Sequence, residues 1–86
     1  MNRLLVYKLI DGERDYQDSL TPDRTDGSDK TVGDYLMMLK YYTDAALAAW
    51  TTSPGTAASL DIIRKCAGIC VHCMEDHEAP ERNLEE

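Results

Sequence analysis

The sequence contains no phenylalanine, only three cysteines and three prolines, and no long hydrophobic run. A membrane-spanning helix needs about 20 predominantly apolar residues in succession, so we expect no membrane segment. An odd number of cysteines argues against a disulfide framework and favours a reducing compartment, the cytoplasm. Nine Lys and Arg stand against sixteen Asp and Glu. The basic residues are scattered, so the sequence offers no basic surface for nucleic acid.

Helical periodicity is the strongest pattern in the chain. Hydrophobic residues make up 43% of it, and over most of its length they recur at spacings of three and four. The predicted elements are three helices at about 3–20, 32–51 and 56–78, a loop at 21–30 and a charged tail at 79–86. A strand at 4–10 is the alternative for the start of the first helix. We therefore expect one all-α domain over 1–86, a small three-helix bundle dominated by a long antiparallel helical hairpin.

The third predicted helix carries an apolar stripe around which the chain is organised. The small or apolar members of this stripe are Leu60, Ile63, Cys66, Ala67, Cys70, Cys73, Met74 and His77. The residues assigned to the outer surface of the same helix are Ser59, Asp61, Arg64, Lys65, Gly68, His72, Glu75 and Asp76. The wide apolar face of the second helix comprises Val32, Tyr35, Leu36, Leu39, Tyr42, Ala46, Leu47 and Trp50. We expect the rest of the chain to cover the stripe of the third helix.

Residues with capping propensity mark the predicted helix ends. Thr31 followed three residues later by Asp34 has the spacing of a capping box, and Asp34 favours the positive end of the second helix. Ser53 or Thr56 is expected to cap the third helix. Pro80 is expected to end that helix, because proline cannot continue the backbone hydrogen-bond pattern.

Cys66, Cys70, Cys73 and His77 form the pattern C-x3-C-x2-C-x3-H, which contains the residue types of a zinc site. On a straight helix these residues spread over roughly 16 Å, so the four cannot all reach one ion. The sequence offers no second cysteine pair elsewhere. We therefore interpret the cysteines as small core residues that permit close helix packing, and we predict no metal site and no cofactor.

Two acidic pairs raise the question of catalysis. Glu75 and Glu78 have an E-x-x-E spacing, and Asp15 and Asp18 form a second pair. This is similar to small all-α nucleotide pyrophosphohydrolases of the MazG type, which hold Mg²⁺ with an E-x-x-E pair on one helix and an E-x-x-D pair on the next. The chain departs from that pattern, because its first pair ends the last helix and no second pair lies mid-helix opposite it. Solvated acidic faces explain these carboxylates better. We predict no catalytic residues, with a MazG-like Mg²⁺-dependent enzyme as the alternative.

Two groups of residues are candidates for binding. The first offers bidentate hydrogen bonding and aromatic stacking for phosphates, nucleobases or proteins; it comprises Arg14, Tyr16, Gln17 and Arg24. An ordinary amphipathic helix is the alternative interpretation of that group. The second comprises Met37, Met38 and Tyr41, which add apolar surface opposite the core face of the second helix. A second apolar patch favours self-association, so we expect a homo-oligomer.

Four segments carry a resemblance that covers most of the chain. They are GERDYQD (Gly12 to Asp18), TVGDYL (Thr31 to Leu36), AAW (Ala48 to Trp50) and LDIIRKCAGICVHCMEDHEAPER (Leu60 to Arg82). With these segments the sequence resembles small proteins of unassigned function encoded by bacteriophages and prophages. The resemblance implies an accessory role in the host cell cytoplasm, such as binding a host protein, countering host defence or sequestering a signalling nucleotide. It carries over no site residues.

These observations together favour a non-enzymatic phage accessory protein that acts as a homo-oligomer by binding a host protein or a small nucleotide. We expect neither nucleic acid nor a membrane among its partners. A structural or assembly component of a virion is a further alternative.

Overall fold

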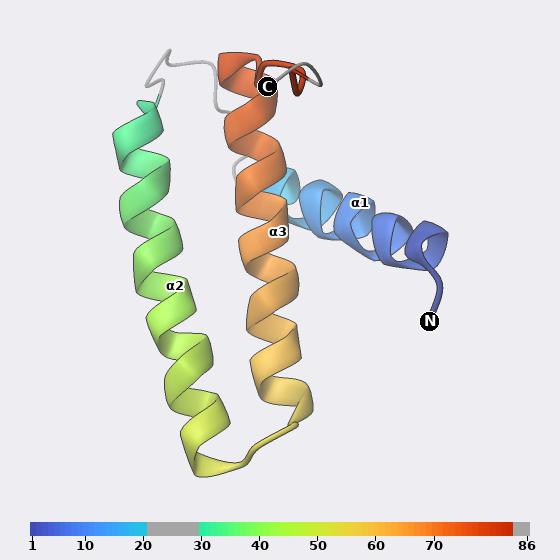
Figure 1. The fold of residues 1–86 in the computed structure, drawn as a ribbon, viewed down its shortest axis with the longest axis vertical. Helices are drawn as coiled ribbons and strands as arrows, with labels where there is room; N and C mark the ends of the chain where they lie inside the picture. The colour runs from blue at the N-terminus through green and yellow to red at the C-terminus, as the bar shows by residue number, and fades with distance from the viewer. Residues whose placement is uncertain (21–29, 84–86) are drawn as a thin grey trace.

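The computed structural model describes residues 1–20 and 30–83, which form three α helices (Figure 1). The helices are α1 (Arg3–Ser19), α2 (Val32–Thr52) and α3 (Ala57–His77). The predicted all-α bundle with a long antiparallel hairpin is confirmed, and each helix end lies within one residue of its predicted position. Residues 4–10 are helical, so the strand alternative is wrong. The predicted loop, apart from Lys30, lies outside the described residues.

Side chains cap the first turns of α1 and α2. Asn2 precedes α1, and its side-chain oxygen accepts a hydrogen bond from the backbone N–H of Leu5 at 3.0 Å. The predicted capping box of α2 is confirmed: Thr31 Oγ1 accepts from the N–H of Asp34 at 3.1 Å, and Asp34 Oδ2 accepts from the N–H of Thr31 at 2.9 Å. Each cap satisfies N–H groups that have no partner within the helix.

The two ends of α3 are built differently. Thr56 occupies the N-cap position but makes no side-chain hydrogen bond to the helix backbone. At the other end, Glu78 adopts the left-handed conformation with φ of 52°. A left-handed residue directly after the last turn is a common way to end a helix. The helix therefore ends at His77, three residues before Pro80, which was the residue expected to end it.

Helices α2 and α3 lie side by side, and Tyr35 is the most deeply buried large side chain between them, at 1% exposed. Its hydroxyl donates a 2.5 Å hydrogen bond to Asp76 Oδ2. The ring packs edge-on against the imidazoles of His72 and His77, with centroid distances of 5.4 and 6.1 Å. His77 Nε2 also lies 2.8 Å from the carbonyl oxygen of Lys30. These contacts hold the start of α2 against the end of α3.

Helix α1 crosses α3 on the side away from α2, and within the described residues it makes no contact with α2 (Figure 1). This placement corrects the predicted outer surface of α3. The prediction was wrong for Gly68 and Ser59, which are buried. Gly68 is buried because α1 packs on the polar side of α3. Arg64 and Glu75 pair with α1, and Glu75 keeps the exposed side chain predicted for it.

The hydrophobic core of one chain is small. Among the described residues only Tyr35, Cys66 and Ile69 are buried hydrophobic side chains. The expectation that the rest of the chain covers the stripe of α3 is wrong for Leu60, Ile63, Met74 and His77, which are exposed. Four residues on the wide apolar face of α2 are exposed as well: Val32, Leu36, Leu47 and Trp50. The physical reason is that α1 docks elsewhere, so α2 and α3 cover each other along one side only. In the part of the chain that the structure describes, no helix is long and apolar enough to span a bilayer.

Candidate interaction surfaces

A buried arginine joins α1 to α3. The Nε of Arg14 donates to Glu75 Oε1 at 2.9 Å, and its Nη2 donates to Asp18 Oδ1 at 3.0 Å. Burial lowers the pKa of the Arg14 guanidinium, but the hydrogen bonds to Glu75 and Asp18 outweigh this effect and the pKa is raised. The guanidinium therefore stays charged, and its carboxylate partners compensate the loss of water around it.

A second set of hydrogen bonds lies beside Arg14. Arg64 Nε donates to Glu13 Oε1 at 3.0 Å, and the amide of Gln17 donates to Glu13 Oε2 at 2.9 Å and to the carbonyl oxygen of Lys65 at 3.3 Å. The pKa of Arg64 is raised, first by the hydrogen bond to Glu13. Gly68 lies directly beneath this set. No buried side-chain nitrogen or oxygen of the described residues lacks a hydrogen bond, so the junction is fully satisfied.

The structure gives the four predicted binding residues different positions. Arg14 is buried and Gln17 is half-buried, and both use their polar atoms within the chain. They fix the crossing of α1 on α3 and offer no free hydrogen-bonding surface. Tyr16 keeps an exposed ring. Arg24 lies outside the described residues.

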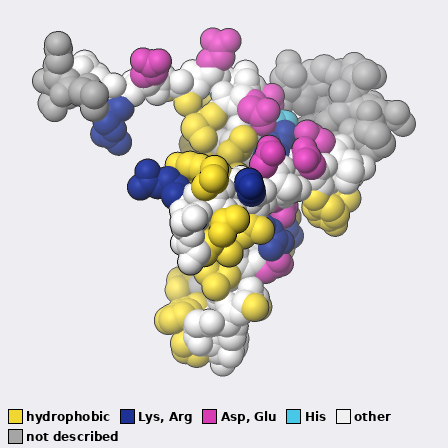
Figure 2. Space-filling view, turned by 90° about the vertical axis from the view of Figure 1, so that its right-hand side faces the viewer, with side chains coloured by type: hydrophobic (Ala, Val, Ile, Leu, Met, Phe, Trp, Pro, Cys, Tyr) yellow, Lys and Arg dark blue, Asp and Glu magenta, His cyan; other side chains and the backbone are white. Residues whose placement is uncertain are grey.

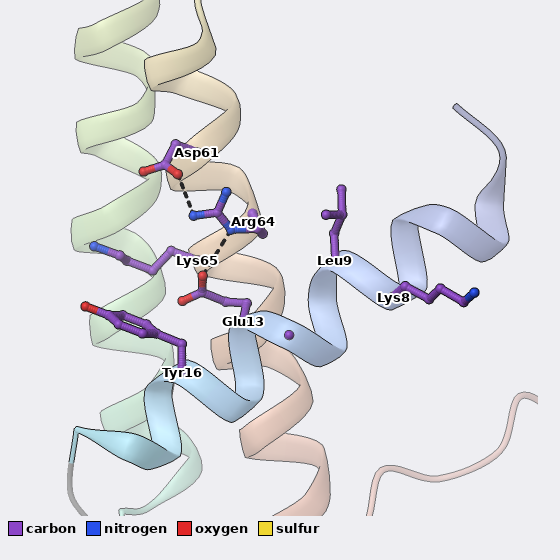
Figure 3. Close-up of a pocket in the computed structure, with 8 residues that line it drawn as sticks. Lys8, Leu9, Glu13, Tyr16, Asp61, Arg64 and Lys65 are labelled. Carbon is purple, nitrogen blue, oxygen red and sulfur yellow. Dashed lines mark hydrogen bonds and ion pairs between the residues drawn. The ribbon is translucent and has the colours of Figure 1, made fainter.

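A notch of about 550 Å³ opens between α1 and α3 (Figure 3). It is lined by Lys8, Leu9, Gly12, Glu13, Tyr16, Asp61, Arg64 and Lys65. Arg64 lies between Glu13 and Asp61 and is paired with both. The amines of Lys8 and Lys65 point in opposite directions, away from the middle of the notch. The notch therefore offers an aromatic ring and an apolar wall, but its positive charges do not converge on one point.

Two of the acidic residues that were considered as metal ligands form ion pairs with Arg14 instead. Glu75 and Asp18 lie on either side of the Arg14 guanidinium, which is the cation between them. The described residues contain no group of three or more His, Cys, Asp or Glu side chains arranged to hold a metal ion. The three cysteines are free thiols, and burial raises the pKa of Cys66.

Two unpartnered apolar surfaces are the main feature that the sequence interpretation missed. The first, which we name the hairpin face, consists of Leu36, Leu47 and Trp50 of α2 with Leu60, Ile63 and Met74 of α3. On each helix these residues lie about a third of a turn around the helix axis from the residues buried between the helices, in the direction of increasing residue number. Because α2 and α3 run antiparallel, this rotation turns both sets of residues to the same side of the hairpin.

The second surface, which we name the α1 arm, is the N-terminal half of α1 (residues 3–9). Its apolar side chains are all exposed: Leu4, Leu5, Val6, Tyr7 and Leu9. Seen from the side from which α1 projects, hydrophobic side chains gather at the centre of the molecule and extend down it, with Lys and Arg beside them (Figure 2). The apolar run at 4–10, interrupted only by Lys8, was the sequence signal for this surface, because one neighbouring helix cannot cover all sides of such a segment.

The patch predicted on α2 is smaller. Met37 and Tyr41 are exposed, whereas Met38 is half-buried. The Tyr41 ring packs edge-on against Tyr42 at a centroid distance of 5.1 Å, so part of its surface is already used within the helix. The patch is thus present but smaller than the hairpin face or the α1 arm.

No protein-family model, curated protein sequence or solved structure matches this chain.

Proposed function

We propose that this chain is a non-enzymatic binding protein whose working form is a homo-oligomer. One observation carries the proposal, the amount of accessible surface that a single chain leaves open. The accessible surface of the chain is 6908 Å², whereas a compact monomer of 9.7 kDa exposes about 5,100 Å². The excess of about 1,800 Å² exceeds the roughly 800 Å² that each partner buries in a standard protein–protein interface.

The shape of the chain supports the same proposal. Its radius of gyration is 14.7 Å, against about 12 Å for a compact domain of this length. A small domain whose described residues include three buried hydrophobic side chains gains little from its own core. Burial of the hairpin face and the α1 arm between copies would add the apolar contacts that the isolated chain lacks.

The target of such an oligomer is the second part of the proposal. Following the resemblance to phage-encoded proteins, we place it in the host cell cytoplasm as an accessory factor that binds a host protein or a small nucleotide, with counter-defence as its role. Tyr16 beside the notch between α1 and α3 supports the nucleotide, because its exposed ring can stack on a base. The pairing of Glu75 and Asp18 with Arg14 gives the MazG-like alternative no support.

Native mass spectrometry of the protein purified from bacterial cytoplasm tests both parts, with gentle and denaturing conditions compared. A defined oligomer that releases a molecule of a few hundred daltons under denaturing conditions supports nucleotide binding and identifies the ligand. A bare oligomer supports self-association and directs the search to protein partners. A chain that stays monomeric at micromolar concentration, checked by light scattering, refutes the proposal.

A further inference from the structure

The α1 arm carries apolar side chains around most of its circumference, with Arg3 and Lys8 between them. Leu4 is 64% exposed and Leu5 47%, and Ile10 is the first half-buried residue of α1. A helix that is hydrophobic all round is normally buried. A short helical segment is also marginal in water without tertiary contacts. The arm therefore requires a partner surface to be a stable helix.

The arm cannot reach the hairpin face of its own chain. The C-terminal half of α1 is held on α3 by the pairs of Arg14 with Glu75 and of Glu13 with Arg64, and Gly68 allows close packing there. Helix α1 makes no contact with α2 within the described residues and projects away from the hairpin (Figure 1). A surface that covers the arm must come from another molecule.

We propose that the α1 arm of one chain packs on the hairpin face of a second copy, so that each copy gives one arm and receives one. This inference rests on the proposed self-association and names the contact that produces it. The hairpin face suits an arm in size, because α2 and α3 are 21-residue helices of roughly 31 Å each and seven residues of the arm span roughly 10 Å.

Charge favours a second copy as the occupant. Residues 1–10 contain Arg3 and Lys8 and no acidic residue, whereas residues 30–83 contain seven Asp and Glu and five Lys and Arg. The arm is thus basic and the body that would receive it is acidic, which favours arm-to-hairpin contact over arm-to-arm contact. Reciprocal exchange also covers the arm and part of the hairpin face of each copy at once, and it gives a closed assembly.

A complementation experiment with two charge-inserting variants tests the contact. Leu5→Glu alters the arm and Leu47→Glu alters the hairpin face, and both side chains are exposed in the single chain, so neither change disturbs its fold. Each variant alone is expected to associate about tenfold or more weakly than the wild type, since a charge is placed in an apolar contact. Mixed in equal amounts, the two are expected to associate again, because one intact arm meets one intact hairpin face.

The readouts are mass by light scattering and the emission of Trp50, the single tryptophan, which lies on the hairpin face. Circular dichroism confirms that both variants are folded. Ala48→Glu is the matched control, since Ala48 is exposed on α2 and belongs to none of the apolar surfaces named above, and it should leave association unchanged. An oligomeric wild type whose two variants fail to complement each other, or which Ala48→Glu dissociates, overturns the arm exchange and leaves the proposed self-association intact. A monomeric wild type overturns both.

Discussion

Arg14 on α1 and Glu75 on α3 are 61 positions apart in the chain, and their side chains meet at 2.9 Å. The arginine is buried and the glutamate is more than half exposed. The carboxylate thus remains hydrated while the guanidinium is fixed by it and by Asp18. Because no contact links α1 to α2 within the described residues, this pair contributes directly to the direction in which the α1 arm projects.

Replacing Arg14 with methionine should destabilise the fold. The change removes a charge-assisted hydrogen bond to each of two carboxylates but keeps most of the apolar stem, so we expect a loss of about 1–3 kcal/mol in the free energy of unfolding. Urea unfolding at one fixed chain concentration measures it, because the stability of an oligomer depends on concentration. The exposed Lys40→Met serves as the control, since its pair with Asp44 lies on the surface of α2. Equal stability of the two variants would show that the Arg14 pairs do not hold α1.

Gly68 allows α1 to approach α3, so Gly68→Ala should separate the two helices. A Cβ at this position would lie 2.8 Å from Gln17 Nε2 and 2.9 Å from Glu13 Cγ. We expect a loss of about 1–3 kcal/mol from this overpacking, even though alanine favours the helix by roughly 1 kcal/mol. Gly33→Ala is the matched control, because its Cβ would meet only Thr31 Oγ1, at an ordinary 3.6 Å. Thermal unfolding of both variants measures the change in stability. A Gly68→Ala variant more stable than the wild type would contradict the observed packing.

Local chemistry made the helices and their ends predictable. The capping box depends only on Thr31 and Asp34, which are three residues apart in the sequence. The spacing of apolar residues likewise indicates a helix without reference to distant residues. The break at 53–56 is a local signal of the same kind. These features do not depend on which helix packs against which, so the sequence alone was sufficient.

The position of α1 depends on contacts between distant residues, and it was not predictable in the same way. The sequence places Arg64, Gly68 and Glu75 on the polar side of α3, which is the usual solvent side. In the structure that side binds α1 through ion pairs and a close approach at Gly68. Arg14 pairs with Glu75 and Asp18 in this contact, so its binding role stays a prediction. The same position of α1 leaves the hairpin face open. The signal available in the sequence for this helix contact was a polar side of α3 that combines charged residues with a glycine.

The three cysteines of α3 should differ in their reactivity. Burial raises the pKa of the Cys66 thiol, and the neighbouring Cys70 adds to this. Alkylation proceeds through the thiolate, so iodoacetamide should modify Cys66 more slowly than the half-buried Cys70 and Cys73. Peptide mass spectrometry of samples quenched at successive times gives the three rates. In urea the rates should converge, and modification of Cys66 as fast as Cys73 in the native protein would argue against its burial.

The capping box of α2 should make stability depend on pH in the acid range. The hydrogen bond from the backbone N–H of Thr31 lowers the pKa of Asp34 below its ordinary value of 3.8. Because the folded pKa lies below the unfolded one, the contribution of Asp34 is complete above pH 3.8 and is lost as the pH falls through the folded pKa. Asp34→Asn should therefore be less stable than the wild type at pH 7, and the gap should narrow below about pH 4.

Urea midpoints at pH 7 and pH 3 measure that gap. Asp44→Asn is the control, since Asp44 lies in the interior of α2, where its exposed pair with Lys40 contributes little and no cap depends on it. If the gap between the wild type and Asp34→Asn were the same at both pH values, the carboxylate charge would have no part in the cap. In that case the stabilisation of this helix end would come from the hydroxyl of Thr31, and Thr31→Ala would be expected to lose about 1 kcal/mol at either pH.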